Sequence, residues 1–492
     1  MQLNTQSPIP MTPKTIIGRE RESRLLTDLC SSGKPEFIAV YGRRRIGKTY
    51  FIDSYFERQY DFYMAGMYEA TLREQLSNFA HQLSLYSKTD HPVPRNWMDA
   101  FFMLQDYLET LLEKKRIVVF IDELPWFDTP RSHFLRAFEL FWNTWASKYG
   151  NLKLIVCGSS TTWMTNKLIG NRGGLHNRVT RQIRMQPFSL REVELFLKSK
   201  GFNLPRKQIV ETYMVMGGTP YYLDMMRKSK SVAQNIDTLF FAQNAPLRNE
   251  FNLLFKSLFN DSRLYKTVVE VLATKSKGLT RQEIIEAAKL TDNGYLSEVL
   301  ENLESCDFIR SYNAFGKKER DMLYQLTDLY SLFYLRFVKT HTGQDEKRWS
   351  HGLDKTAAWK GYAFEQVCLH HIPQIKKKLG ISGVLTDVSS WTSKPLIDSD
   401  GTSWAGGQID LLIDRKDGII NVCEMKFADK EYVITKAYNS DLIERMETFR
   451  HHSKTRKGLH QTLITTFGVA HNAYWNDVHS EVTMDDLFEE TN

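Results

Sequence analysis

The chain has 492 residues, of which 42% are hydrophobic and 25% are charged, a balance that is ordinary for folded proteins and excludes wholesale disorder. This length exceeds what one hydrophobic core usually serves, so about three or four domains are expected. The formal net charge of +7 favours acidic partners such as nucleic acid only slightly on a chain this long.

The cysteines and the first residues indicate where the protein resides. No CxxC pair occurs among the five cysteines, which fits reduced, buried thiols. Residues 1–14 are polar and lack the apolar core of a signal peptide, and no later stretch approaches the length of a membrane span. We therefore expect an intracellular, cytoplasmic protein without a membrane partner. The cysteines are Cys30, Cys157, Cys306, Cys368 and Cys423.

The N-terminal part alternates apolar runs with sequence of helical period. Residues 36–41 form a β-branched and aromatic run, followed by a glycine-rich segment and then by apolar residues at helical spacing. This order predicts a strand, a loop and a helix. Further apolar runs at 116–121 and 152–157 each follow helical-period sequence. The alternation predicts an α/β domain with a parallel sheet, which we assign to residues 12–186.

The glycine-rich segment at 42–49 is a complete GxxxxGK[ST] motif. Such a P-loop directs backbone N–H groups at phosphate, while the N-terminus of the following helix adds positive potential. Lys48 is expected to neutralise the β- and γ-phosphates of ATP, and Thr49 to ligate Mg²⁺ through its hydroxyl. The predicted nucleotide-binding residues of this segment are Gly42, Arg43, Arg44, Arg45, Ile46, Gly47, Lys48, Thr49 and Tyr50.

Two carboxylates end the next apolar run. Asp122 and Glu123 would lie at the carboxyl edge of a parallel sheet, beside the phosphates. Asp122 is expected to hold the Mg²⁺ shell, and Glu123 to polarise the attacking water. Ser159 follows the third run and is either a polar sensor of the nucleotide or a simple turn serine. Together with the P-loop, these residues predict a P-loop ATPase core.

The middle of the chain is predicted to contain a lid and a DNA-binding type of module. Helical spacing of apolar residues predicts an all-helical lid at 187–259. For 260–345 the pattern predicts helices at 264–272, 280–288 and 295–303 and a hairpin of 308–312 with 322–326, the elements of a winged helix-turn-helix. Thr280 and Glu283 form a capping-box signature. Lys317 and Lys318 on the wing could touch phosphate, but the third helix is acidic, so a packing role is the alternative.

Two short segments resemble the STAND-type ATPases of the AAA+ class. Ile16-Ile17-Gly18-Arg19-Glu20 is similar to their hhGRE element, and Gly217-Gly218-Thr219-Pro220 to their GxP element. The resemblance covers about the first half of the chain. It implies that Gly18, Arg19 and Glu20 border the adenine and that Pro220 in the lid senses the bound nucleotide. Without it, 217–220 reads only as a turn.

Hydrolysis in this class also needs a cation for the charge that develops on the phosphate. Arg178 follows the third predicted strand, where it could act in its own chain or on a second copy of the chain. Arg172 and Arg181 compete for this role.

The last part, 346–492, contains a second group of chemically active residues. Glu365 lies on a predicted helix at 359–379, Asp410 on a strand at 408–414, and Glu424 and Lys426 on the next strand, at 419–427. Because alternate residues of a strand share a face, Glu424 and Lys426 should point the same way. Asp410 and Glu424 could clamp Mg²⁺ on a phosphodiester while Lys426 helps to activate water.

Asp414 is the alternative metal ligand, and the pair His370 and His371 on the Glu365 helix is expected to be exposed. The order of helix Glu, strand Asp and ExK resembles the PD-(D/E)xK nuclease superfamily and implies a restriction-endonuclease-like α/β domain. The alternative is that these charges merely cap strands.

The sequence therefore predicts a parallel-sheet P-loop ATPase core, a helical lid, a winged helix-turn-helix and a C-terminal nuclease-like domain. The hypothesis is an ATP-hydrolysing switch coupled to a metal-dependent nuclease acting on nucleic acid, in defence or as a conditional toxin, with an unidentified protein or ligand trigger. The rival is an ATPase whose last two domains only bind DNA or protein partners.

Overall fold

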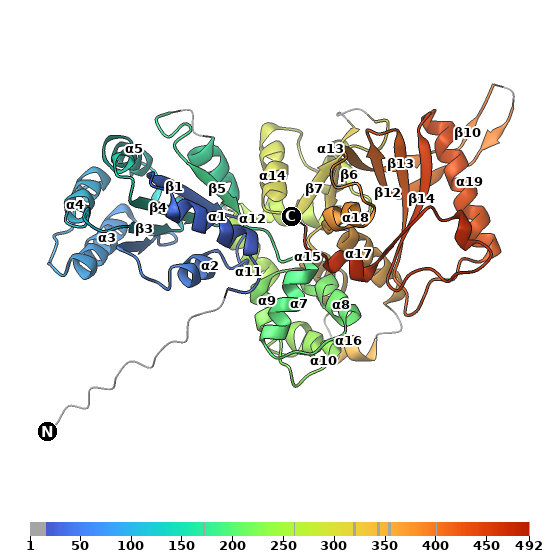
Figure 1. Ribbon diagram of the computed structural model, residues 1–492, viewed down its shortest axis with the longest axis horizontal. Coiled ribbons are helices and arrows are strands. Elements are labelled where there is room, and N and C mark those ends of the chain that lie inside the picture. The colour runs from blue at the N-terminus through green and yellow to red at the C-terminus, as the bar shows by residue number, and fades with distance from the viewer. Residues whose placement is uncertain are drawn as a thin grey trace. The chain divides into compact units, whose positions relative to one another are not determined.

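The computed structural model describes residues 16–170, 173–259, 261–317, 321–341, 345–352, 356–399 and 401–491. The candidate residues Arg172 and Lys318 lie outside these ranges. The chain forms two compact units, which divide between Gln186 and Pro187 (Figure 1).

Unit 1 is an α/β layer structure built on a five-stranded sheet with the order β2-β3-β4-β1-β5. Every strand pair in it is parallel, which confirms the predicted parallel sheet. The strands are β1 (Glu36–Tyr41), β2 (Phe62–Ala65), β3 (Ile117–Asp122), β4 (Leu152–Gly158) and β5 (Arg181–Arg184). The helices are α1 (Glu20–Ser31), α2 (Lys48–Tyr55), α3 (Leu72–Ser87), α4 (Trp97–Glu109), α5 (Phe134–Leu140) and α6 (Thr161–Trp163), with short 3-10 or π turns η1 (Leu124–Phe127), η2 (Phe141–Trp145), η3 (Ala146–Lys148) and η4 (Met164–Ile169).

Helices cover both faces of this sheet. Residues of α3, α4 and α5 pack on one face, around Phe37 and Val119 of the strands, and residues of α1 and α2 pack on the other, around Ile38 and Phe120. Burial on both faces explains why β1, β3 and β4 are buried at every position and read as continuous apolar runs.

Unit 2 begins with helices and a small antiparallel sheet. The helices of 187–259 are α7 (Leu190–Ser199), α8 (Arg206–Met216), α9 (Pro220–Asp224), α10 (Val232–Ile236), the π turn η5 (Asp237–Phe241) and α11 (Glu250–Leu258). The α12–β8 segment follows, with α12 (Ser262–Leu272), β6 (Leu279–Thr280), α13 (Arg281–Ala288), α14 (Gly294–Ser305), β7 (Ile309–Tyr312) and β8 (Leu323–Leu326), and its sheet has the order β6-β8-β7. The capping box expected at Thr280 and Glu283 is confirmed.

The C-terminal part of unit 2 is a mixed sheet, β15-β14-β13-β12-β9, with α17 on one face and α19 on the other. Its helices are α15 (Leu329–Phe333), η7 (Tyr334–Val338), α16 (Arg348–His351), α17 (Ala357–His370), α18 (Ile372–Lys378), α19 (Lys436–Ser453), η9 (Trp475–Asp477) and η10 (Met484–Phe488). Its strands are β9 (Thr386–Ser393), β10 (Leu396–Ile397), β11 (Ser403–Trp404), β12 (Gly407–Arg415), β13 (Ile419–Lys426), β14 (Gly458–Thr465) and β15 (Ser480–Thr483).

One hydrophobic cluster joins all three parts of unit 2. It includes Leu190 of α7, Val268 of α12, Phe333 of α15, Phe364 of α17 and Met425 of β13. The helices of 187–259, the α12–β8 segment and the C-terminal sheet therefore share one core.

The expectation that His371 is exposed is wrong. His370 is exposed, but His371 is 1% exposed because the predicted helix breaks into α17 and α18 at this residue. The backbone N–H of Leu190, at the start of α7, donates to His371 Nε2 at 3.0 Å, and His371 Nδ1 lies 2.7 Å from the carbonyl oxygen of Val367. His371 therefore ties α7 to α17. All five cysteines are free, and all but Cys30 are buried, as predicted.

Burial lowers the pKa of His371 to about 4, from 6.5 for an ordinary histidine. Between pH 6.5 and 4, His371 is protonated in the unfolded chain but not in the folded chain. The free energy of unfolding therefore decreases as the pH falls through this range, by about 3 kcal/mol at most. We expect His371→Gln, which keeps an acceptor for Leu190, to flatten the pH dependence of hydrogen exchange in α7 and α17 between pH 7 and about 4.5.

The exposed neighbour supplies the control, since His370→Gln should retain the wild-type pH profile. Identical profiles for His371→Gln and wild type would show that protonation of His371 does not govern this junction.

Among the described residues, no helix combines the length and the apolar content needed to cross a bilayer.

Candidate functional site

The P-loop of unit 1 has the backbone that its glycines require. A Cβ atom on Gly42 would lie 2.2 Å from the carbonyl oxygen of Met185, so a larger residue does not fit there. Gly47, with φ of 84°, is the N-cap residue of α2 and has no side chain to cap that helix. The loop therefore leaves a helix N-terminus available to an anion.

Lys48 and Thr49 lie where the motif predicts. The Lys48 side chain is 6% exposed, and its ammonium donates to the carbonyl oxygens of Gly42 at 2.8 Å and Arg43 at 3.0 Å. The Thr49 hydroxyl donates to Asp122 Oδ2 at 2.8 Å. Burial and the neighbouring charge of Glu123 raise the pKa of Asp122. These hard oxygen donors suit Mg²⁺, which would favour the ionised form of Asp122.

Glu123 is held by the predicted sensor serine. The Ser159 N–H and hydroxyl both donate to Glu123 Oε2, at 3.1 and 2.8 Å. Because β4 lies between β1 and β3, this pair stands at the same carboxyl edge as the P-loop. Ser159 therefore holds the carboxylate that is expected to act on water, and its role as a sensor of the nucleotide stays a prediction.

The segment ahead of β1 also reaches the P-loop. Gly18 and Arg19 adopt positive φ angles of 68° and 63°, and the Arg19 side chain, 5% exposed, donates to the carbonyl oxygen of Ile46 at 3.3 Å. Arg44 stacks over the Trp126 ring at 5.6 Å, a contact that the sequence did not indicate. Tyr50 is 49% exposed at the first turn of α2.

In unit 2, four predicted residues come together. Glu365 of α17 is partly buried, and burial together with the charges of Asp410 and Glu424 raises its pKa to about 8, an effect that the charge of Lys426 opposes. Such charge interactions require proximity. We call Glu365, Asp410, Glu424 and Lys426 the acidic cluster: Asp410 and Glu424 line one cavity, Lys426 contacts Glu424, and the charges of these three residues act on Glu365.

Both carboxylate oxygens of Glu424 are occupied. Lys426 Nζ lies 2.7 Å from Oε1, the Tyr438 hydroxyl donates to Oε1 at 2.8 Å, and Arg445 pairs with Oε2. Burial alone would raise the pKa of Glu424, but the charges of Lys426 and Arg445 hold it below its usual range. Tyr438 and Arg445, both on α19, are site residues that the sequence pattern did not reveal.

A cavity of about 420 Å³ adjoins this cluster, with Asp410, Glu424 and Arg445 in its wall. Within the described ranges, no group of three or more His, Cys, Asp or Glu side chains is arranged to hold a metal ion. Asp410 and Glu424 can offer oxygen ligands only if Glu424 exchanges a cationic partner for the metal. Asp414, the alternative ligand, is paired with Lys457.

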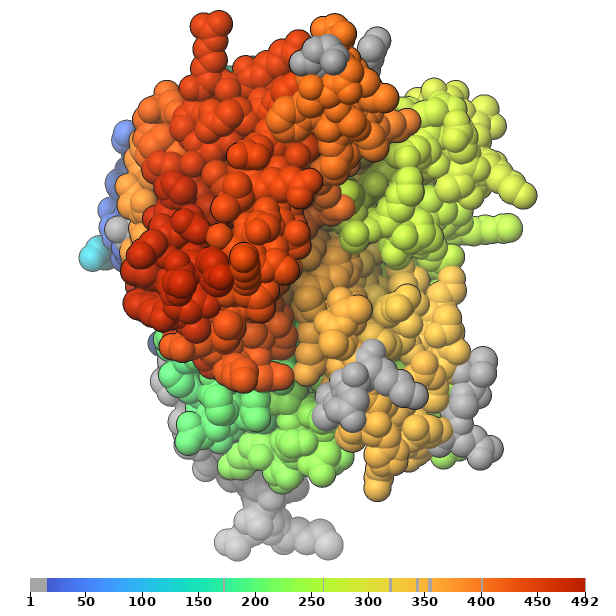
Figure 2. All heavy atoms as spheres, turned by 90° about the vertical axis from the view of Figure 1, so that its right-hand side faces the viewer, coloured from blue at the N-terminus to red at the C-terminus, as the bar shows by residue number. Residues whose placement is uncertain are grey.

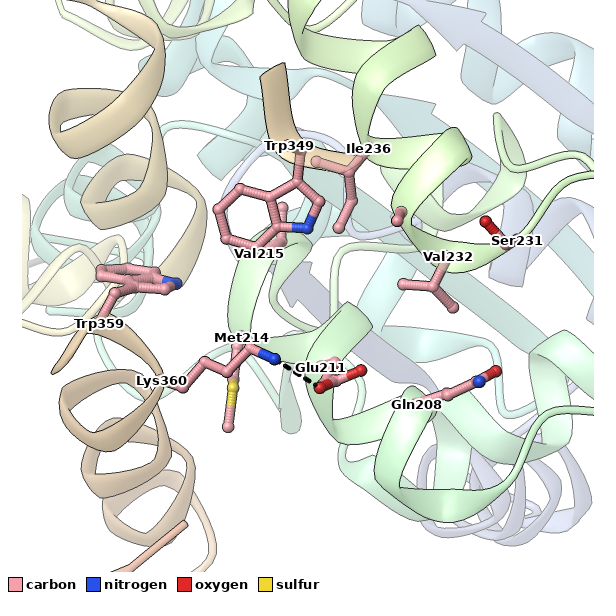
Figure 3. A pocket seen from close by; sticks show the side chains of 11 residues that line it. Gln208, Glu211, Met214, Val215, Ser231, Val232, Ile236, Trp349, Trp359 and Lys360 are labelled. Atoms are coloured by element: carbon pink, nitrogen blue, oxygen red, sulfur yellow. Dashed lines mark hydrogen bonds and ion pairs between the residues drawn. The ribbon is translucent and has the colours of Figure 1, made fainter. Parts of the chain in front are cut away.

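A separate pocket of about 220 Å³ lies among α8, α10, α16 and α17 (Figure 3). Trp349 and Trp359 form part of its wall, and Lys360 pairs with Glu211 at 3.0 Å across it. None of the predicted site residues lines it.

The comparisons with known proteins agree with the nucleotide site. Residues 16–226 match the model of a family described as an ATPase domain predominantly from Archaea. These residues form an archaeal-type ATPase domain with a P-loop. The match passes the boundary at Gln186 and includes α7, α8 and α9 of unit 2.

Similar proteins are known in sequence and in structure. An uncharacterized protein of Methanocaldococcus jannaschii is 24% identical over 86% of this chain and 90% of its own length. An uncharacterized ATP-binding protein of Pyrococcus abyssi is 26% identical over 51% of this chain and 86% of its own. Among solved structures, a Walker-type ATPase of P. abyssi is similar, with a TM-score of 0.45 at 20% identity over 65% of this chain and 96% of that one.

The structure places the other predicted residues of the ATPase domain on separate elements. Arg178 is exposed in a turn, and Arg181 is exposed on β5. The segment before Arg178 is held by a hydrogen bond of 2.8 Å from Asn143 Nδ2 to the carbonyl oxygen of Gly174. Pro220 is the first residue of α9 in unit 2. Gly218, two residues before it, packs so closely that a Cβ would lie 1.8 Å from the carbonyl oxygen of Phe188.

We expect Lys48→Ala to weaken ATP binding by at least about tenfold, because a buried ammonium inside a phosphate loop has no substitute. Titration of the full chain with a fluorescent ATP analogue measures this. Lys115→Ala removes an exposed lysine of the same unit and should leave the affinity unchanged. Equal affinities for Lys48→Ala and wild type would place the nucleotide elsewhere.

Proposed function

We propose that this chain is an ATP-binding and ATP-hydrolysing switch coupled to a Mg²⁺-dependent nuclease domain that acts on nucleic acid. The observation that carries the nuclease assignment is that Asp410 and Glu424, from neighbouring strands, line one cavity, with Lys426 Nζ 2.7 Å from Glu424. The charges of these three residues also act on the pKa of Glu365. The predicted winged helix-turn-helix, which adjoins this site in unit 2, adds a module of the kind that binds nucleic acid.

The ATPase half of the proposal rests on the polar contacts beside the P-loop. Lys48 would exchange its contacts with loop carbonyls for the β- and γ-phosphates, and Thr49 and Asp122 would hold Mg²⁺. The ion would offset phosphate charge. Glu123, oriented by Ser159, would accept the proton of the attacking water. In this proposal Gly18 and Arg19 border the adenine, Pro220 senses the nucleotide, and Arg178, from this or a second copy, supplies the cation.

We expect Glu123→Gln to lower ATP hydrolysis by at least about 100-fold while ATP binding persists, because the amide cannot accept the proton. Phosphate release and analogue binding, measured on the same samples, separate the two effects. Ser159→Ala should lower hydrolysis less, since it misorients Glu123 without removing it. Hydrolysis by Glu123→Gln at the wild-type rate would exclude Glu123 as the base.

For the nuclease half, Asp410 and Glu424 would hold Mg²⁺, which would polarise the scissile phosphodiester when bound. Lys426, released from Glu424, would orient the attacking water or stabilise the developing charge. Glu365 lies close enough to influence this charge balance.

We expect metal-dependent cleavage of plasmid, linear duplex or single-stranded nucleic acid to fall by at least about 100-fold in Lys426→Ala. The cleavage rate should also differ between ATP and ADP, and this difference should disappear in Lys48→Ala. Lys430→Ala, four residues along and exposed, is the matched control and should cleave normally. Cleavage by Lys426→Ala at the wild-type rate would exclude this cluster as the nuclease site.

A second candidate function is an ATPase whose C-terminal domain only binds DNA or a protein partner. The occupied state of both Glu424 oxygens favours it, because Lys426 and Arg445 already neutralise the carboxylate. Intact ATPase activity without cleavage would select this function. Steep loss of nucleic-acid binding with salt would then separate a DNA binder from a binder of proteins.

A further inference from the structure

Two cations of the α12–β8 segment approach the acidic cluster in unit 2. The segment, yellow-green in Figure 2, lies beside the orange and red C-terminal sheet domain on this face. β7 and its following loop make the contact, since Ser390 Oγ of β9 donates to the Tyr312 hydroxyl at 3.2 Å and the Phe315 N–H donates to the carbonyl of Ser390 at 2.7 Å.

Ser390 stands opposite the bulge of β12 that carries Asp410. β12 pairs with β9 through Ile409 with Trp391 and then through Leu412 with Ser389, so Asp410 and Leu411 together face Ser390. The contact between Tyr312 and Ser390 therefore brings the α12–β8 segment to the strand position that holds a predicted metal ligand.

Lys277 is fixed at this junction by its backbone. The Tyr312 hydroxyl donates to its carbonyl oxygen at 2.7 Å. Gly278, with φ of 86°, follows it at a place where a Cβ would lie 2.3 Å from the carbonyl oxygen of Tyr324. Burial lowers the pKa of Lys277, and the charge of Asp410 opposes that shift. The backbone of Lys277 is thus fixed at the junction with Tyr312 and Ser390, the residue that faces Asp410 across the bulge.

Arg310 of β7 is the second cation. Its guanidinium lies 4.4 Å from the centre of the Tyr312 ring, and its Nε donates to Gln325 Oε1 at 2.6 Å. Burial lowers the pKa of Arg310, while interactions with Tyr312 and Tyr362 oppose that shift. The charge of Glu365 in turn helps to raise the pKa of Tyr362. No ion pair joins Arg310 or Lys277 to a carboxylate within the described part of the chain.

Partly buried cations without a carboxylate partner cost free energy unless an anion completes their environment. Here they flank a cluster whose proposed chemistry needs a phosphodiester beside Asp410. By contrast, α14, which would enter a major groove in the usual winged-helix mode, carries Glu298, Glu301 and Glu304, which repel phosphate.

We propose that Lys277 and Arg310 form a binding site for a backbone phosphate of nucleic acid, so that the β6–β7 side of the α12–β8 segment, not its third helix, holds the substrate at the acidic cluster. This inference rests on the proposed nuclease function. It names the substrate-binding wall of that same site.

The test is binding of labelled 30-nucleotide single-stranded DNA, duplex DNA and single-stranded RNA to the full chain, measured by anisotropy in EDTA over a series of salt concentrations. We expect Lys277→Ala to weaken binding about five- to tenfold and to reduce the slope of log affinity against log salt by about 0.7 to 0.9, the loss of one phosphate contact. Arg310→Gln, which retains a polar partner for Gln325, should have a similar effect, and Lys277→Arg should restore binding.

Lys256→Ala is the control, because this lysine of α11 is exposed and has no role in the proposed site. It should leave affinity and slope unchanged. Wild-type binding by Lys277→Ala and Arg310→Gln, with nuclease activity intact, would overturn this inference alone. Weakened binding by both variants in a protein that never cleaves would support it while the nuclease assignment fails. Absence of binding by the wild type to all three probes would overturn both.

Discussion

The hydrogen bond from Thr49 to Asp122 is the constraint on which the nucleotide site depends. It joins the first turn of α2 to the end of β3, although β1 and β3 are separated by β4 and hence stand roughly 10 Å apart. That spacing leaves room for phosphates between the P-loop and the carboxylates. β4 lies between these two strands, and Ser159 at its carboxyl end donates a hydrogen bond to Glu123. This bond keeps the Glu123 carboxylate at the same edge of the sheet. Strand order therefore fixes the site more than any single motif residue does.

In the C-terminal sheet a local irregularity has the corresponding role. Ile409 and Leu412 both pack toward α19, although residues three apart on a regular strand face opposite sides. The bulge between them shifts the phase of β12 at Asp410, so that regular alternation resumes at Leu412. Bulges of this kind often change the direction of a side chain beside an active site. Here that side chain is Asp410, whose charge acts to raise the pKa values of Glu365, Tyr312 and Lys277.

Sequence patterns predicted the elements whose signal is local. β1, β3 and β4 are long apolar runs and were predicted, whereas β2 and β5 were missed because β2 is short and β5 is mostly exposed. Alternation along β13 placed Glu424 and Lys426 on one face, and they lie 2.7 Å apart. Tyr438, Arg445 and Lys277 could not be predicted, because their roles arise from packing between segments distant in sequence. The burial of His371 was missed for the same reason, since its partner is Leu190.

The shared core of unit 2 limits how ATP could act on the C-terminal domain. The matched ATPase domain extends to residue 226, so its last helices belong to the unit that carries the acidic cluster. α7 packs in the same hydrophobic cluster as α17 and β13 and is tied to α17 through His371. Moving α7 alone would break buried contacts, each worth on the order of 1 kcal/mol or more. A nucleotide-dependent change is therefore least costly when α7, the α12–β8 segment and the C-terminal sheet move as one body, which preserves the contact of Tyr312 with Ser390.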